Sequence, residues 1–403
     1  DESVPSPDDE TLETTSSDHN NKDDQQTVVH SESDPVLNNS NSNNNSNNPN
    51  DKFCVIHVGP HKTGSTSLQD FILEAPASKS ALAKDHYWVP HFPEGIGQAV
   101  HEPGKNHAIF ANCVRSSGSR NFCPTGRVRD QNLIYFRTFV KDAASTGSNI
   151  VLSSEEFDAM DVDVHELTSF FTQHHYKVHI VLYYRRFYDW VISWYNQLTK
   201  TGWNNGYIPF EQWCNMATLE RYKKEHSIAT YKHYMNGANG GGVFNVSVVN
   251  MHEDPDHYDS DMRFACDHLD NAPHSCELAK SKVSSHNNGS VDLTWKMFRH
   301  KLKNHHSIHL SQSDERWVQI ETKFNQMTDF PLLCLPNNVQ DRMLAISLEA
   351  EITLTPEWWY NSKEGLEHLK ADFAEKIKSK FCTMDFATVL RSPEWQNFLT
   401  GLQ

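Results

Sequence analysis

Short runs of apolar residues, separated by stretches with helical periodicity, are the main structural signal along the chain. The runs at 53–58, 149–153, 178–184 and 243–250 are largely apolar throughout rather than at every second position. A strand of this kind is buried on both faces, as in a parallel sheet covered by helices. The aromatic run at 87–89 indicates a fifth, shorter strand.

The stretches between these runs favour helices. Apolar residues recur at helical spacing after residue 65, near 106–114, at 167–175 and at 187–200. Strands that alternate with helices predict an α/β fold, in which a parallel sheet is covered by helices on both faces. From about residue 291 the pattern is mainly helical, and we expect a helical C-terminal extension of the same domain.

The first 50 residues differ from the rest in composition. They contain eleven acidic residues and one lysine, Lys22, so ten of the sixteen net negative charges lie there. The tract at 38–50 is nearly all Asn and Ser, which bury too little apolar surface to offset the entropy of ordering. We expect residues 1–50 to be a disordered acidic stem or tail and residues 51–403 to form one domain. The balance of charge favours no nucleic-acid partner.

The cysteines and the glycosylation sequons bear on the cellular compartment of the protein. Cys113 with Cys123, and Cys266 with Cys276, share a short spacing in stretches that we expect to be loops, and spacing leaves the pairing of the eight cysteines open. Asn-x-Ser sequons begin at Asn38, Asn44, Asn245 and Asn288. Together these features favour a secretory lumen such as the Golgi, with the cytoplasm as the alternative.

Membrane attachment is the second question of compartment. No run of 18 apolar residues is present that would span a bilayer. The sequence begins at Asp1 rather than at Met, so it stays open whether a membrane anchor or signal peptide precedes it.

The strongest motif follows the first expected strand and leads into a helix. Its sequence is Gly59-Pro60-His61-Lys62-Thr63-Gly64-Ser65-Thr66-Ser67-Leu68-Gln69. Backbone amides at a helix N-terminus bind anions, Gly64 permits close backbone approach, and Lys62 adds a positive charge. A buried strand, a glycine-containing loop and a helix in this order make the expected fold P-loop-like. The motif is not a Walker A motif, in which the lysine follows the second glycine. A Ser- and Thr-rich helix cap without a ligand is the alternative.

A second motif begins at the carboxyl end of the expected strand at 178–184. It reads Arg185-Arg186-Phe187-Tyr188-Asp189-Trp190-Val191-Ile192-Ser193-Trp194-Tyr195-Asn196-Gln197. Ligands of open α/β sheets bind outside the carboxyl ends of strands, where Arg185 and Ser193 can hold one phosphate. We expect Arg186 to point away into a surface ion pair. The aromatic residues Tyr188, Trp190 and Trp194 are expected in the core.

Together the two motifs resemble those of 3′-phosphoadenosine-5′-phosphosulfate (PAPS)-dependent sulfotransferases, of the bacterial type and in part of the Golgi carbohydrate type. The resemblance covers about residues 53–290. It implies that Lys62 bridges the bond that breaks and that neighbouring groups hold the 5′-phosphate, namely Thr63, Gly64, Ser65, Thr66 and Ser67. It also implies that Arg185 and Ser193 hold the 3′-phosphate. Whether Ser284, Ser285 and Asn287 form a third contact with the nucleotide stays open.

The implied reaction moves a sulfuryl group from PAPS to an acceptor hydroxyl and releases 3′-phosphoadenosine-5′-phosphate. The hydroxyl must lose its proton to a base. Four candidates are open, of which Glu155 and His107 rank first, followed by Glu156 and His101. A carbohydrate is the favoured acceptor class, because of the stem-like N-terminus and the aromatic-rich helix.

Metal binding and two rival functions complete the sequence-based expectations. His305, His306 and His309 indicate a solvated basic face rather than a metal site, and the expected chemistry needs no metal. The first rival is a P-loop-type small-molecule kinase, which would require the Walker A order. The second is a non-catalytic protein that binds nucleotide or glycan.

Overall fold

The computed structural model divides the chain into two units, Asp1–Asn47 and Asn48–Gln403. All described residues belong to the second unit. They are residues 51–60, 68–69, 75–90, 106–115, 123, 126–201, 208–239, 244–252, 260–281, 293–303, 310–311, 313–354 and 363–402.

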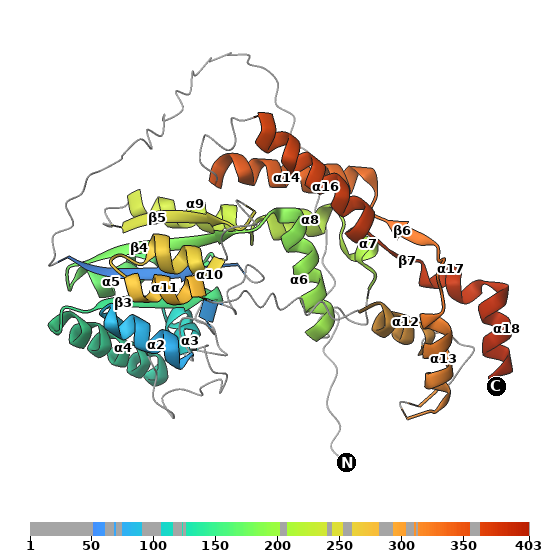
Figure 1. Ribbon diagram of the computed structural model, residues 1–403, viewed down its shortest axis with the longest axis horizontal. Helices are drawn as coiled ribbons and strands as arrows, with labels where there is room; N and C mark the ends of the chain where they lie inside the picture. Colours follow the sequence, from blue (N-terminus) through green and yellow to red (C-terminus); the bar gives the residue numbers. More distant parts are fainter. Residues whose placement is uncertain are drawn as a thin grey trace, which may run out of the picture. The chain divides into compact units, whose positions relative to one another are not determined.

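The described residues contain a five-stranded parallel sheet in the order β2-β3-β1-β4-β5 (Figure 1). Its strands are β1 (Lys52–Val58), β2 (Tyr87–Trp88), β3 (Asn149–Ser154), β4 (Tyr176–Tyr184) and β5 (Phe244–Asn250). These are the five strands predicted from the apolar runs, and the prediction of a parallel sheet is confirmed. The central strand is β1, with β3 and β4 beside it.

Successive side chains of each strand point to opposite faces of this sheet, and helices cover both faces. Cys54, Ile56 and Val58 belong to one buried cluster, whereas Val55 belongs to another. The first face is covered by α3 (Asn106–Cys113), α4 (Arg127–Ser145), α5 (Val164–Thr172) and α9 (Ser227–Asn239). The second carries α2 (Pro76–Lys84) and η3 (Phe264–His268), with α10 (Ser260–Arg263) and α11 (Pro273–Ser281) packed beside them. The predicted α/β class is therefore confirmed.

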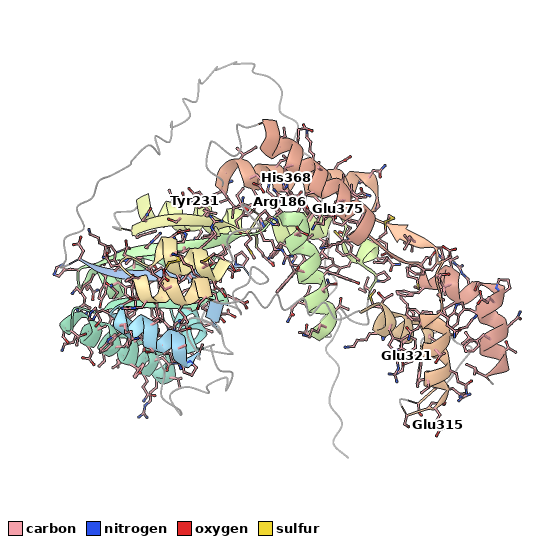
Figure 2. The ribbon with its side chains drawn as sticks, in the orientation of Figure 1. Arg186, Tyr231, Glu315, Glu321, His368 and Glu375 are labelled. Atoms are coloured by element: carbon pink, nitrogen blue, oxygen red, sulfur yellow. A yellow bond between two sulfur atoms is a disulfide. The ribbon has the colours of Figure 1, made fainter. Side chains whose placement is uncertain are left out.

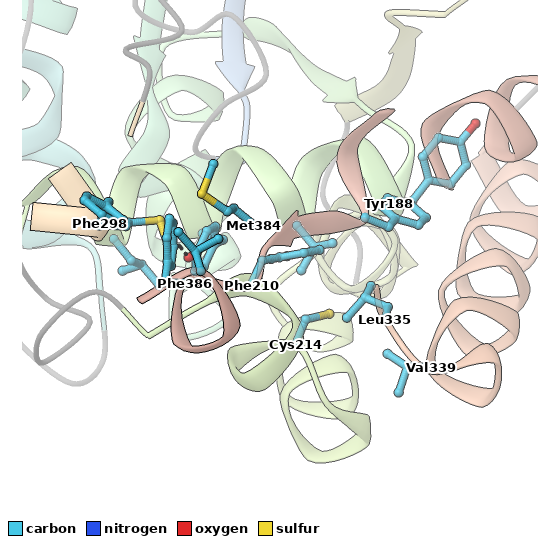
Figure 3. Close-up of a cluster of buried hydrophobic side chains, with 14 of the residues drawn as sticks. Tyr188, Phe210, Cys214, Phe298, Leu335, Val339, Met384 and Phe386 are labelled. Atoms are coloured by element: carbon cyan, nitrogen blue, oxygen red, sulfur yellow. Dashed lines mark hydrogen bonds between the residues drawn. The ribbon is translucent and has the colours of Figure 1, made fainter. Parts of the chain in front are cut away.

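Helix α6 (Phe187–Thr201) leaves the sheet and joins a second core (Figure 3). Tyr188 and Trp190 are buried in this core and Trp194 packs against it, as predicted for the aromatic residues of this helix. The surrounding elements are α7 (Phe210–Trp213), α8 (Met216–Lys223), α12 (Leu293–Lys303), α13 (Arg316–Asn325), α14 (Asn337–Leu354), α16 (Lys363–Lys380), α17 (Phe386–Arg391) and α18 (Pro393–Gly401). The predicted helical C-terminal part is confirmed, and it shares its core with α6.

Some local elements differ from the sequence-based expectations. The helix expected at 167–175 begins at Val164, because the carboxylate of Asp163 accepts a hydrogen bond from the Glu166 amide and caps it. The pattern did not predict α4, whose N-cap is Gly126 at φ 81° without a side-chain cap. A short antiparallel pair, β6 (Leu332–Cys334) and β7 (Cys382–Met384), interrupts the C-terminal helices.

Three disulfides cross-link the described residues: Cys113–Cys123, Cys266–Cys276 and Cys334–Cys382. The first two join the cysteines that share a short spacing. The expectation that they lie in loops is wrong for three of the four, because Cys113 ends α3, Cys266 lies in η3 and Cys276 lies in α11. Two buried cysteines, Cys54 and Cys214, are free thiols.

Within the described ranges, none of the helices combines the length and the apolar character that crossing a membrane would require.

Candidate functional site

The carboxyl ends of three neighbouring strands meet at one edge of the sheet. Val58, the last residue of β1, pairs with Ser154 of β3 on one side and with Leu182 of β4 on the other. Glu155 follows β3 directly, and Arg185 follows β4 directly. The chain leaves β1 toward β2 on one side and leaves β4 toward β5 on the other. Open α/β sheets bind ligands at such a switch point.

The motif at residues 59–69, which the sequence predicts to bind phosphate, starts at this edge. Gly59 and Pro60 follow β1 and are buried, and Leu68 is buried under the second face of the sheet in a helical turn with Gln69. The proposed ligand residues between them lie outside the described residues: Lys62, Thr63, Gly64, Ser65, Thr66 and Ser67. The structure thus places the start of the motif at the carboxyl end of β1 and Leu68 under the second face of the sheet.

Arg185 lies at the neighbouring strand end and Ser193 lies in the helix that follows, as the sequence predicts. Arg185 directly follows β4, Ser193 lies in α6, and both are half-buried. The carbonyl of Arg185 accepts a hydrogen bond from Nε2 of His226 at 2.8 Å, which fixes the backbone there. Burial lowers the pKa of the Arg185 guanidinium, and the carboxylate of Asp189 opposes this shift.

Arg186 is buried, so the prediction of a surface ion pair was right about the pair and wrong about the surface. Its side chain is only 1% exposed and pairs with Glu351 of α14 at 3.0 Å and with Asp372 of α16 at 3.1 Å. Its amide donates to Nε2 of His252. Burial alone would lower the pKa of Arg186, but Tyr188 and Glu351 raise it. Figure 2 shows Arg186 beside the helices of the C-terminal part.

Two adjacent glutamates, Glu155 and Glu156, follow β3. Glu156 pairs with Arg115 at 3.2 Å, and its amide donates to Oγ of Ser154. Glu155 opens η2 (Glu155–Asp158), is half-buried, and acts electrostatically on His57 of β1. Glu155 therefore lies at the switch point, beside the start of the predicted phosphate-binding motif.

His107 is buried beneath the strand ends rather than displayed at them. The Ser153 amide donates to its Nδ1 at 2.8 Å, so the proton of the neutral ring is on Nε2, which lies 3.3 Å from the Pro90 carbonyl. Protonation of Nδ1 would break the bond to Ser153. These contacts give His107 a structural role in holding the end of β3, which its sequence position does not reveal.

His57 is a residue of this region that sequence reasoning missed. Its Nδ1 lies 2.8 Å from Oγ of Ser153, and the ring is fully buried against Tyr183 and Phe264. Burial lowers the pKa of His57 to about 3, although the carboxylate of Glu155 opposes the shift. The ring is therefore neutral at physiological pH. The sequence signal that could have identified His57 is its position inside an apolar strand, one residue before Val58.

Several predicted residues lie outside the described residues. They are His101, the third-contact candidates Ser284, Ser285 and Asn287, and the histidines His305, His306 and His309. Within the part of the chain that the structure describes, no group of three His, Cys, Asp or Glu side chains is arranged to hold a metal ion.

Comparisons with known proteins add little. No family model matches the chain, and no curated protein matches it. One solved structure, from the PezAT chromosomal toxin–antitoxin system of Streptococcus pneumoniae, is similar over 50% of this chain and 69% of that chain. The identity is 12% and the TM-score is 0.27, a likeness too weak to bear on function.

Proposed function

We propose that the protein is a PAPS-dependent sulfotransferase. The observation that carries this proposal is the parallel pairing of β1 with β4, which brings the start of the phosphate-binding motif beside Arg185. PAPS carries an anionic group at each end, a 5′-phosphosulfate and a 3′-phosphate. Two cationic elements at adjacent strand ends suit a ligand with this charge pattern.

Each element takes one end of the donor. The motif that begins at Gly59 binds the 5′-phosphosulfate, and Lys62 neutralises charge on the phosphate that departs. Its other groups, Thr63, Gly64, Ser65, Thr66 and Ser67, hold the 5′-phosphate. Arg185 and Ser193 hold the 3′-phosphate.

Glu155 is the proposed base, because it directly follows β3 at the strand ends and acts electrostatically on His57 of the neighbouring strand. Glu156 pairs with Arg115, and both ring nitrogens of His107 face backbone groups. The acceptor oxygen attacks sulfur while its proton passes to Glu155. The bond from sulfur to the bridging oxygen breaks, and 3′-phosphoadenosine-5′-phosphate leaves.

The proposed acceptor is a carbohydrate hydroxyl, and the proposed compartment is a secretory lumen such as the Golgi. Three disulfides among the described residues support an oxidising compartment, because disulfides persist there and are rare in the cytosol. The exposed sequon residue Asn245 on edge strand β5 agrees with a glycoprotein.

Calorimetric titration of the full chain with 3′-phosphoadenosine-5′-phosphate, and separately with ATP, tests the donor class. Binding of the former alone supports the proposal, and Arg185→Ala should weaken it at least about tenfold by removing charge-assisted hydrogen bonds. Arg221→Ala is the matched control, because this arginine is 71% exposed and pairs only with Glu225 among the ion pairs described. Binding of ATP alone, or of neither nucleotide, would overturn the proposal.

A further inference from the structure

Asp189 lies midway between the two residues proposed to hold the 3′-phosphate. It is four positions before Ser193, so these two residues share one side of α6, and its carboxylate acts electrostatically on Arg185 just before the helix. Its side chain is only 5% exposed. A buried carboxylate requires positively charged partners, so the partners of Asp189 show which other element of the fold packs against this part of α6.

The partners are two lysines of α16. Nζ of Lys376 lies 3.6 Å and Nζ of Lys380 lies 3.9 Å from the same oxygen, Oδ1 of Asp189. The two lysines are one turn apart and share a face of α16. Both distances exceed those of a charge-assisted hydrogen bond, which is about 2.8 Å. The ammonium groups are therefore held beside Asp189 without being locked to it.

Positive charge is in excess in this cluster. Its cations are Arg185, Arg186, Lys376 and Lys380, and its carboxylates are Asp189, Glu351 and Asp372. Arg186 engages Glu351 and one oxygen of Asp372 at close to 3 Å, whereas the ion pairs of Lys376 and Lys380 with Asp189 and Asp372 are 3.6 to 3.9 Å long. Burial lowers the pKa of Lys380, and repulsion from Lys376 and Arg185 adds to this effect while Asp189 opposes it. Lys380 thus lies within electrostatic reach of Arg185.

We infer that Lys376 and Lys380 complete the anion site of Arg185 and Ser193, so that a phosphate monoester is held from α6 on one side and from α16 on the other. This inference rests on the proposed function and names the C-terminal helical part as a direct contributor to the 3′-phosphate site. A dianion there would relieve the mutual repulsion of Arg185 and the lysines. Lys380 is 44% exposed and Lys376 is 21% exposed, so both remain open to solvent and ligand.

A purely structural role is the competing explanation, since the lysines also tie α16 to α6 through Asp189. The two explanations differ in which nucleotide they affect. A contact to the 3′-phosphate matters for 3′-phosphoadenosine-5′-phosphate and not for adenosine 5′-monophosphate, which lacks that group. Loss of a structural tie would weaken both nucleotides alike.

The test is calorimetric titration of the full-length Lys376→Gln, Lys380→Gln and double variants with these two nucleotides. Each single change should weaken binding of the 3′-phosphorylated nucleotide about three- to tenfold, and the double change more, because each removes one charge at a partly screened site. Binding of adenosine 5′-monophosphate should be unchanged. Lys370→Gln is the control, because Lys370 lies on the same helix but is 47% exposed and pairs with Glu367.

The possible outcomes separate the inference from the proposed function. If the wild type binds the 3′-phosphorylated nucleotide and both lysine variants bind it equally well, the inference fails and the sulfotransferase proposal stands. An equal loss for both nucleotides also overturns the inference. If the wild type does not bind the 3′-phosphorylated nucleotide at all, the proposed function itself fails.

Discussion

Nε of Arg186 donates to a carboxylate oxygen of Glu351 at 3.0 Å, and both side chains are almost completely buried. The two residues are 165 positions apart, at the start of α6 and within α14. Asp372 of α16 accepts a second bond from the guanidinium, and the hydroxyl of Tyr184 donates to Glu351. This network therefore fastens the C-terminal helices to the end of β4, immediately beside Arg185.

Glu351→Gln should lower the free energy of unfolding by about 3–5 kcal/mol. The substitution removes the buried carboxylate that pairs with Nε of Arg186 and leaves the guanidinium with the more exposed Asp372 as its carboxylate partner among the ion pairs described. Urea unfolding of the variant and the wild type measures the difference. Glu277→Gln removes an exposed carboxylate paired with Lys280 and should change stability by less than about 0.5 kcal/mol. A Glu351 variant as stable as this control would show that the buried pair contributes little.

The cross-links allow a second stability prediction. Cys334–Cys382 closes a loop of 48 residues, whereas Cys113–Cys123 closes one of 10. A disulfide stabilises chiefly by restricting the unfolded chain, so its loss costs about 4 kcal/mol for the longer loop and about 2.7 kcal/mol for the shorter. Paired Cys→Ser variants, compared by denaturant unfolding, measure both. Equal losses, or a larger loss for the shorter loop, would contradict the loop-length argument.

The sheet was predictable from sequence because a strand that is buried on both faces consists of a continuous run of apolar residues, which can be recognised locally. The placement of Arg185 after a strand and of Ser193 in the next helix was predictable too, because both follow from the local pattern of one strand and one helix. Lys376 and Lys380 could not be found this way. They lie in an amphipathic helix with many lysines and glutamates, and only tertiary packing brings them to Asp189.

Sequence does not report the burial of a polar group, and two residues show this. His107 looks available because its neighbourhood is polar, yet the structure buries it between the Ser153 amide and the Pro90 carbonyl. Arg186 looks solvated because arginines are mostly exposed. Its burial depends on Glu351, which no local pattern connects to it.

The buried ring of His226 should make stability depend on pH. Its Nε2 donates to the Arg185 carbonyl, and its buried Nδ1 meets no hydrogen-bond partner in the described part of the chain. Burial lowers the pKa of His226 from the ordinary 6.5 to about 4, and the bond to Arg185 opposes this shift. The unfolded chain therefore binds more protons between those values, so the free energy of unfolding falls as the pH falls through that window.

His226→Gln removes the titration while its amide can still donate to Arg185. The wild type should lose about 2 kcal/mol more stability than the variant between roughly pH 7.5 and pH 5. Urea unfolding at both pH values gives the comparison, and the other histidines cancel because both proteins contain them. An identical pH dependence in the two proteins would mean that His226 binds a proton equally well in the folded state.

Two neighbouring carboxylates provide the sharpest test of the proposed chemistry. Glu155→Gln should slow sulfuryl transfer about 10²- to 10⁴-fold, because it removes the proposed base and leaves the proposed donor-binding residues in place. Transfer from radiolabelled PAPS to a panel of oligosaccharides measures the rate, and titration with 3′-phosphoadenosine-5′-phosphate should show unchanged donor binding.

Glu156→Gln is the matched control, since its carboxylate pairs with Arg115 and lies one residue away. It should affect stability by up to about 1 kcal/mol, as a partly exposed ion pair does, and leave transfer nearly unchanged. If Glu155→Gln transfers at the wild-type rate, the proton goes elsewhere and the carboxylate after β3 is not the base. If both variants lose donor binding together, the stretch after β3 supports the nucleotide site rather than the chemical step.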